Sequence, residues 1–314
     1  MSKRPTCVVL GGSGFLGQAL CSRLLKAGYA VRSISRSGHP RTATRSWHSE
    51  VEWIAASIDS DSAARALEGA DIVYHLASST LPSTSNLDMP FDLQANTLAT
   101  LRLLNAARMR IGKLIFVSSG GGTVYGSPQC NPIPESHPTN PLCAYGIHKL
   151  AIEKYLNLFQ HLYGLTSVTL RVSNIYGEGQ DCARQLGAVA HFTAHALKGE
   201  PIEIWGDGSI VRDYVHVDDV ADALLSASIY SGTHSLFNIG CGVGTSLNEL
   251  VELIQRRVPH ALKINYKPGR GFDVAQNVLD IRLASVEMNW RPMIGIQAGL
   301  ERMLNKKADA TPGR

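Results

Sequence analysis

A tyrosine and a lysine four residues apart are the pair in this chain best suited to acid–base chemistry. The stretch AYGIHKLAIEKYL places Tyr145 and Lys149 on one face of a predicted helix, because side chains at i and i+4 are neighbours. A tyrosine hydroxyl with a pKa near ~10 is a poor base at neutral pH. A lysine ammonium one helical turn away would stabilise the phenolate. The pair therefore predicts proton transfer to or from a substrate hydroxyl.

A glycine-rich loop follows the first apolar run of the chain. The segment GGSGFLG lies between a predicted strand, residues 7–12, and a predicted helix, residues 14–28. In such a turn the backbone N–H groups that open the helix approach a pyrophosphate, and a glycine permits close packing of helix on strand. The loop predicts a dinucleotide site formed by Gly11, Gly14, Phe15, Leu16 and Gly17.

The second predicted strand, AVRSIS, ends in Ser35 and is followed by Arg36, where a nucleotide-binding fold often carries an acidic residue. An acid there would hold the adenosine ribose hydroxyls and repel a 2′-phosphate. With Ser35 and Arg36, a 2′-phosphate meets no repulsion and gains a guanidinium partner. In the alternative interpretation Arg36 only stacks on the adenine or faces solvent. The cofactor is therefore expected to be NAD or NADP.

Apolar runs alternate with helical patterns through the first half of the chain, which predicts right-handed βαβ units and a parallel sheet with helices on both faces. The further predicted strands are residues 30–35, 51–57, 71–78 and 113–119, and the further predicted helices are residues 61–69 and 96–110.

From about Tyr176 the pattern becomes turn-rich. Residues 199–220 predict a β-hairpin, and residues 245–258 predict a helix behind a Thr-Ser cap. We expect an α/β fold, a Rossmann-type doubly wound parallel sheet with a smaller C-terminal α+β substrate-binding portion. The expected boundaries are residues 1–175 for the dinucleotide-binding domain, mainly 176–304 for the substrate-binding portion, with 215–240 able to return to the first domain, and 305–314 for a flexible tail.

Composition excludes several classes of protein. The chain has 314 residues, of which 44% are hydrophobic and 18% charged, and a net charge of +4. This balance is typical of a globular protein and gives no basic field that would attract nucleic acid. Neither a signal peptide nor a run long enough to span a bilayer is found. The six scattered cysteines predict reduced thiols in the cytoplasm, and His191 and His195 predict an exposed helix face rather than a metal site.

Taken together, the motifs resemble those of the extended short-chain dehydrogenases/reductases, specifically the NAD-dependent epimerase/dehydratase family of the UDP-glucose/UDP-galactose 4-epimerase type. The resemblance covers nearly the whole chain. The matching segments are GGSGFLG, HLAS, SSGGGTVYG, NPLCAYGIHKLAIE, LRVSNIYG, GDGSIVRDYVHVDDVADAL, FNIG and GRGFDV.

The resemblance implies a role for particular residues. Tyr145 would be the acid/base that acts on a sugar hydroxyl, and Lys149 would hold the nicotinamide ribose and lower the pKa of Tyr145. The implied substrate contacts are Asn174, Arg212 and Arg270, with the arginines at the phosphates, although Arg212 could instead pair with a neighbouring aspartate. The further implied cofactor contacts are Ile58, Leu76, Ala77 and Asn96.

The chain also departs from the family pattern. The family usually has its catalytic serine or threonine four residues before the tyrosine of VYG, and Gly121 stands there in this chain. Ser119 or Thr123 is therefore expected to take that role, with a slight preference for Ser119. The loop lacks the Asp-Glu pair that 4,6-dehydratases use, and Ser57 replaces a frequent aspartate near the adenine. The role of the polar stretch SSTLPSTSNLD, residues 78–88, stays open.

These features together predict a nucleotide-sugar 4-epimerase, most simply of UDP-hexoses, that works by transient oxidation at C4 with a tightly bound nicotinamide cofactor. The alternative is an NADPH-dependent reductase of a 4-keto nucleotide-sugar, and a more distant one is a non-catalytic NADP-sensing protein. We expect a cytoplasmic homodimer that needs no metal and binds neither nucleic acid nor membrane.

Overall fold

A computed structural model describes most of the chain, including the predicted catalytic helix and glycine loop. The described residues are 4–40, 45–107, 111–180, 187–269 and 274–308.

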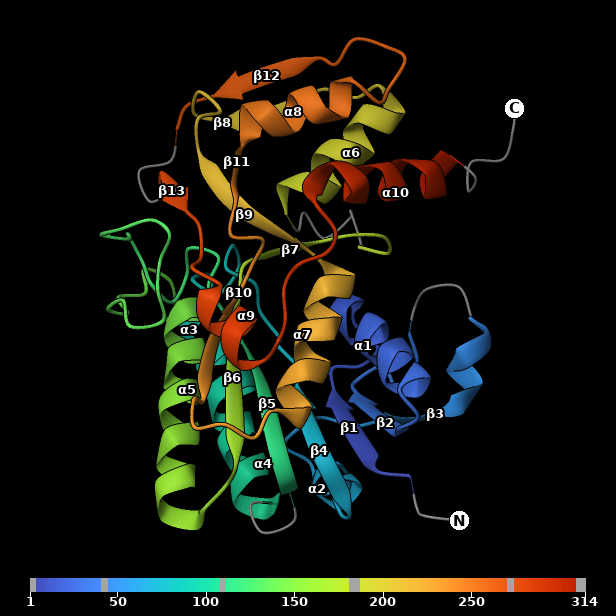
Figure 1. Ribbon diagram of the computed structural model, residues 1–314, viewed down its shortest axis with the longest axis vertical. Helices are drawn as coiled ribbons and strands as arrows, with labels where there is room; N and C mark the ends of the chain where they lie inside the picture. Colours follow the sequence, from blue (N-terminus) through green and yellow to red (C-terminus); the bar gives the residue numbers. More distant parts are fainter. Residues whose placement is uncertain (1–3, 41–44, 108–110, 181–186, 270–273, 309–314) are drawn as a thin grey trace.

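The core of the fold is a seven-stranded sheet in which every neighbouring pair of strands is parallel (Figure 1). Most residues of its central strands are buried, as expected for a sheet covered on both faces. In spatial order they are β10 (Leu236–Ile239), β6 (Ser167–Val172), β5 (Ile111–Ser119), β4 (Ala70–His75), β1 (Thr6–Leu10), β2 (Ala30–Ser35) and β3 (Val51–Ala55). The order reverses between β1 and β4, so the two strands open a crevice at their carboxyl ends, where ligands of such sheets bind.

Helices cover both faces of this sheet, which confirms the predicted doubly wound architecture. On one face the apolar core includes α1 (Phe15–Lys26), α7 (Val217–Ile229) and α9 (Arg282–Glu287). On the other face it includes α2 (Asp61–Ala66), α4 (Ala99–Ala107) and the long α5 (Ala144–Tyr163). Two further short helices connect strands, η1 (Ser46–Glu50) and α3 (Met89–Asp92).

A smaller portion lies beyond the carboxyl ends of the parallel strands, at the top of Figure 1. It has its own apolar core. Its helices are α6 (Ala188–Lys198), α8 (Leu247–Gln255) and α10 (Ile296–Ala308), and its strands are β7 (Asn174–Tyr176), β8 (Ile202–Trp205), β9 (Val211–His216), β11 (Gly244–Ser246), β12 (Ile264–Lys267) and β13 (Gln276–Asn277). The predicted cap of α8 is confirmed, because Ser246 Oγ accepts from Glu249 N and the Glu249 carboxylate accepts from Ser246 N.

The predicted hairpin over residues 199–220 is wrong. Strand β8 pairs in parallel with β12, whereas β9 pairs with β7, β11 and β13. The turn between β8 and β9 contains Gly206 and Gly208, both with positive φ, and it leads the chain from one sheet into the other rather than back along the same strand.

Two predicted boundaries also move. The predicted helix 96–110 is preceded by α3 and begins as a π-helical segment, η2 (Leu93–Leu98), before it continues as α4. At the C-terminus, α10 runs to Ala308, inside the stretch predicted as a tail, and residues 309–314 lie outside the described residues.

Candidate active site

The glycine loop has the shape that a dinucleotide pyrophosphate requires. Gly11 has a φ of +90°, and a Cβ there would lie only 3.0 Å from Ala77 N. A Cβ on Gly17 would overlap the carbonyl oxygen of Gly11. Helix α1 begins after Gly14 with neither a side-chain cap nor an acidic residue in its first turn. The N–H groups that open α1 are therefore presented to an anion, and these residues fit a dinucleotide.

Other predicted cofactor residues gather around this loop, at the carboxyl ends of β1 to β4. Leu76 and Ala77 follow β4 directly and lie against Gly11. Ser35 ends β2, and its hydroxyl donates to Gly38 O at 2.9 Å. Arg36 is exposed beside it, and Ile58 is half-buried after β3. The side chain at the end of β2 is therefore a serine engaged with its own turn, with no carboxylate among residues 30–40.

Tyr145 and Lys149 lie together on α5, as the spacing predicts. Lys149 is 2% exposed, its Nζ lies 5.6 Å from the centre of the Tyr145 ring, and it donates to Val117 O at 2.9 Å. Strand β5 thus orients the ammonium, and the first turn of α5 orients the phenol.

Burial disfavours the charged form of both side chains, so the Lys149 ammonium loses its proton more readily than usual and the Tyr145 phenol holds its proton more firmly. Burial lowers the pKa of Lys149 from 10.5 to about 8, although Glu153 and Asp92 oppose this shift. Burial raises the pKa of Tyr145, Cys143 and Asp92 raise it further, and a side-chain hydrogen bond with Ser119 lowers it. Positive charge near the phenol oxygen is therefore needed before Tyr145 can accept a proton.

Of the two candidate hydroxyls, that of Ser119 acts on the Tyr145 phenol. The Ser119 hydroxyl is the side-chain partner that lowers the pKa of Tyr145. Thr123 is buried, and its hydroxyl donates to Ser119 O at 3.3 Å. These contacts favour Ser119 over Thr123 as the hydroxyl partner of Tyr145, and the catalytic role of Ser119 stays a prediction.

Asn96, predicted near the cofactor, holds the loop that follows β4. It lies in the π-helical segment, where such bulges often mark functional positions. Its Oδ1 accepts from Ser79 N at 2.8 Å, and its Nδ2 donates to Thr80 Oγ1 at 3.0 Å and to Asp92 O at 2.9 Å. Asn96 therefore positions residues next to Ala77, and a direct contact with the cofactor stays a prediction.

The predicted substrate residues lie at the junction of the two portions. Asn174 opens β7 beside the glycine run of the Ser119 loop, because a Cβ on Gly121 would lie 3.2 Å from Asn174 Oδ1. Arg212 lies on β9, where its Nη1 donates to Val274 O at 2.6 Å. Arg270 lies outside the described residues.

Four side chains near the pair were not identified from the sequence. Ser85 and Asn86 accept hydrogen bonds from the first N–H groups of α5, and Asp92 bonds His148 on the same helix. Ser85 and Asn86 belong to the polar stretch whose role was open. A possible signal was the absence of a capping side chain at Cys143, immediately before the helix.

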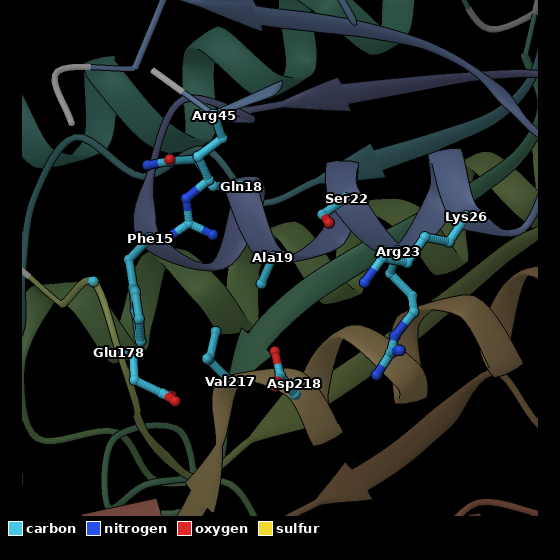
Figure 2. Close-up of a pocket in the computed structure, with 11 residues that line it drawn as sticks. Phe15, Gln18, Ala19, Ser22, Arg23, Lys26, Arg45, Glu178, Val217 and Asp218 are labelled. Carbon is cyan, nitrogen blue, oxygen red and sulfur yellow. The ribbon is translucent and has the colours of Figure 1, made fainter. Parts of the chain in front are cut away.

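A separate pocket of about 230 Å³ runs along α1 (Figure 2). Basic side chains of α1 line one side, and Glu178 and Asp218 line the other. Of the residues predicted for the site, only Phe15 borders it. The pocket therefore adjoins the cofactor loop without containing the tyrosine–lysine pair.

Neither a metal centre nor a membrane helix is found in the described ranges. No group of three or more His, Cys, Asp or Glu side chains there could hold a metal ion. His191 and His195 lie with ring centroids 4.1 Å apart, and His195 Nδ1 bonds Pro201 O. Among the same residues, no helix has both the length and the apolar character needed to cross a bilayer.

Known proteins resemble this chain in both sequence and fold. The model of the NAD dependent epimerase/dehydratase family matches residues 7–240. A UDP-glucose 4-epimerase of Mycolicibacterium smegmatis is 35% identical, covering 94% of this chain and 96% of the relative. A dTDP-4-dehydro-6-deoxyglucose reductase of Escherichia coli is 29% identical, covering 95% and 96%. The crystal structure of Thermotoga maritima UDP-glucose 4-epimerase with UDP-glucose superposes with a TM-score of 0.89 at 32% identity, covering 97% and 99%.

Proposed function

Because this chain belongs to the NAD dependent epimerase/dehydratase family, we propose that it is a nucleotide-sugar 4-epimerase acting on UDP-hexoses. The observation that carries the proposal is the pair of half-buried Tyr145 and buried Lys149, with Ser119 near the phenol, next to a loop shaped for a dinucleotide. The UDP-glucose 4-epimerase relatives, one of them crystallised with UDP-glucose, support this choice of substrate.

In the proposed reaction one proton moves between the sugar and Tyr145, and Ser119 assists this transfer through a hydrogen bond. Tyr145, as the phenolate, accepts the proton of the sugar C4 hydroxyl and becomes the neutral phenol, and before this transfer Ser119 stabilises the phenolate through a hydrogen bond. NAD, when bound, supplies the reversible oxidation at C4. Lys149 stabilises the phenolate through its positive charge, and Val117 O keeps its ammonium in place. After the 4-keto sugar has turned over in the site, Tyr145 returns the proton, so no net proton is consumed.

The substrate contacts are proposals at the junction of the two portions. Asn174 lies beside the Ser119 loop, and we propose that its side chain contacts the sugar or its diphosphate. Arg212 and Arg270 are proposed for the phosphates, since a guanidinium binds two phosphate oxygens at once. Loss of UDP-sugar affinity in Asn174→Ala would support this placement.

A 4-keto nucleotide-sugar reductase is the second candidate, favoured by the end of β2. Ser35 and Arg36 leave room and charge for a 2′-phosphate, and the Escherichia coli relative is a reductase of a 4-dehydro sugar. A reductase would consume NADPH in proportion to product. A non-catalytic NADP sensor is disfavoured, because such a protein needs no tyrosine, lysine and serine arranged around a reacting hydroxyl.

The deciding experiment uses the purified protein without added cofactor. Interconversion of UDP-glucose and UDP-galactose, with nucleotide recovered from the denatured protein, would support the epimerase. NADPH consumption matched to a 4-keto sugar, without interconversion, would replace it by the reductase. Tyr145→Phe is expected to abolish turnover while retaining the nucleotide, and an active Tyr145→Phe enzyme would exclude Tyr145 as the acid/base.

A homodimer is also proposed. Helix α5 exposes apolar side chains at spacings that place them on one face, namely Ile147, Tyr155, Leu158 and Leu162. Exposed apolar faces of this kind are commonly covered by another chain. A light-scattering mass of a single chain at micromolar concentration would contradict the proposal.

We also propose a cytoplasmic location. The described cysteines Cys7, Cys21, Cys130, Cys143 and Cys241 are unpaired, as is usual in a reducing compartment. Cell fractionation tests this location.

A further inference from the structure

Helix α5 lacks a local N-cap, and a distant polar segment supplies one. Cys143 precedes the helix without a capping side chain. Ser85 Oγ accepts from Tyr145 N at 3.0 Å, and Asn86 Oδ1 accepts from Ala144 N at 2.9 Å. A cap that bonds the N–H of the catalytic tyrosine itself fixes where the helix begins.

The same segment makes a second, buried connection one turn into α5. His148 Nδ1 lies 2.8 Å from Asp92 Oδ2, and both side chains are 2% exposed. Thr80 Oγ1 and Asn96 Nδ2 donate to the Asp92 carboxylate as well. Because a carboxylate only accepts hydrogen bonds, the proton of this contact lies on His148 Nδ1.

The imidazole of His148 lies directly against the catalytic phenol. The two rings meet edge to face, with centroids 4.9 Å apart. His148 Nε2 is buried and has no hydrogen-bond partner in the described part of the chain. Burial and the charge of Lys149 lower the pKa of His148, which keeps the ring neutral. The Nδ1 bond to Asp92 is thus the hydrogen bond that fixes the orientation of this ring.

One continuous segment therefore connects the cofactor loop to the catalytic helix. It begins at Ala77, which lies against Gly11, and it ends at Asp92, which bonds His148. We propose that Asp92 and His148, with the Ser85 and Asn86 cap, are positioning residues that hold the Tyr145 phenol in register with the cofactor crevice. This inference rests on the proposed function only in its kinetic test, because measuring kcat requires the proposed epimerase activity.

Three single substitutions test the Asp92 connection. His148→Ala removes the ring and its donor, and kcat is expected to fall about 10- to 100-fold with KM within about threefold, as for a displaced reacting group. His148→Asn keeps an amide N–H near the Nδ1 position and should hold kcat within about threefold of the wild type. His161→Ala, at an exposed position on the same helix, is the matched control and should leave kcat unchanged.

A second measurement does not depend on activity. In NMR spectra of protein with ¹³C-labelled tyrosine, the signal of Tyr145 is the one that disappears in the Tyr145→Phe variant. The wild type and His148→Asn should give one sharp signal, and His148→Ala a broadened or doubled one. If the wild type shows no epimerase activity, the proposed function fails, and this measurement still decides the positioning role.

Two results would overturn the proposal. The first is a His148→Ala variant whose kcat, or whose sharp Tyr145 NMR signal, is unchanged from the wild type. The second is an equal loss of kcat in His148→Asn and His148→Ala. If His148→Ala does not fold, Ser85→Ala takes its place, since it removes the cap's hydrogen bond to Tyr145 N and leaves the Asp92–His148 pair intact. Its kcat is then expected to fall about tenfold at similar KM, and a wild-type kcat would refute the proposal.

Discussion

Replacing Lys149 with methionine is expected to stabilise the folded protein near neutral pH, although it removes half of the proposed catalytic pair. Burial lowers the pKa of Lys149 from 10.5 to about 8. At about 1.4 kcal/mol per pH unit, holding the charged lysine in the folded state costs about 3 kcal/mol. Methionine removes the charge but leaves Val117 O without its donor, a loss of about 1 to 2 kcal/mol. The expected net gain near pH 7 is about 1 to 2 kcal/mol.

The sign of the difference in unfolding free energy between Lys149→Met and the wild type should depend on pH. Below pH 8 the lysine is charged in both states, and the folded protein bears the full cost. Between pH 8 and 10.5 the unfolded chain binds more protons than the folded one, so the stability of the wild type rises with pH relative to the variant. Above that window the neutral lysine keeps its hydrogen bond at no charging cost, and the wild type becomes the more stable protein.

The assay is urea unfolding of nucleotide-free protein at pH 7, 8, 9 and 10, because bound nucleotide would add its own stabilisation. Lys154→Met is the matched control, since Lys154 is exposed on the same helix. Titration of all other groups is shared and cancels in the difference between variants. A Lys149→Met protein less stable than the wild type at pH 7, or a difference that stays constant from pH 7 to 10, would refute the reasoning.

Three further substitutions test other parts of the structure. Gly17→Ala drives a Cβ into Gly11 O, and we expect a loss of about 1 to 3 kcal/mol in thermal unfolding together with loss of retained nucleotide; unchanged retention would contradict the assigned packing role. Arg171→Met leaves the Glu153 carboxylate buried without its bidentate partner, which should cost about 3 to 5 kcal/mol in urea unfolding. Ser35→Asp places a carboxylate where a 2′-phosphate would lie, and the Kd for NADP measured by fluorescence titration should rise at least about tenfold relative to that for NAD; an unchanged ratio would place the adenosine elsewhere.

The Rossmann half of the fold was predictable because its signals are local. Strands such as β1 and β4 are short apolar runs, and the loop from Gly11 to Gly17 has a backbone requirement that only glycine meets. The hairpin prediction failed because pairing partners are not local. Strand β8 finds β12 some sixty residues later, and the intervening sequence does not mark that partner.

The candidate site divides in the same way. Tyr145 and Lys149 follow from helical spacing. The sequence offered both Ser119 and Thr123 as the hydroxyl residue, with only a slight preference for Ser119. The path of the loop favours Ser119 as the hydroxyl partner of the phenol. Asp92 and His148 are 56 residues apart in sequence, and their contact depends on how α3 packs on α5. Contacts between residues so far apart in the chain cannot be predicted from residue spacing alone.

The return of β10 to the edge of the parallel sheet, together with α7 on its face, limits how this molecule can be divided. A chain cut near residue 176 would lose the strand beside β6 and the helix that covers α1, so an apolar surface would be laid open on the remaining piece. Because the chain passes between the parallel sheet and the smaller portion more than once, no single cut separates the two without exposing apolar surface.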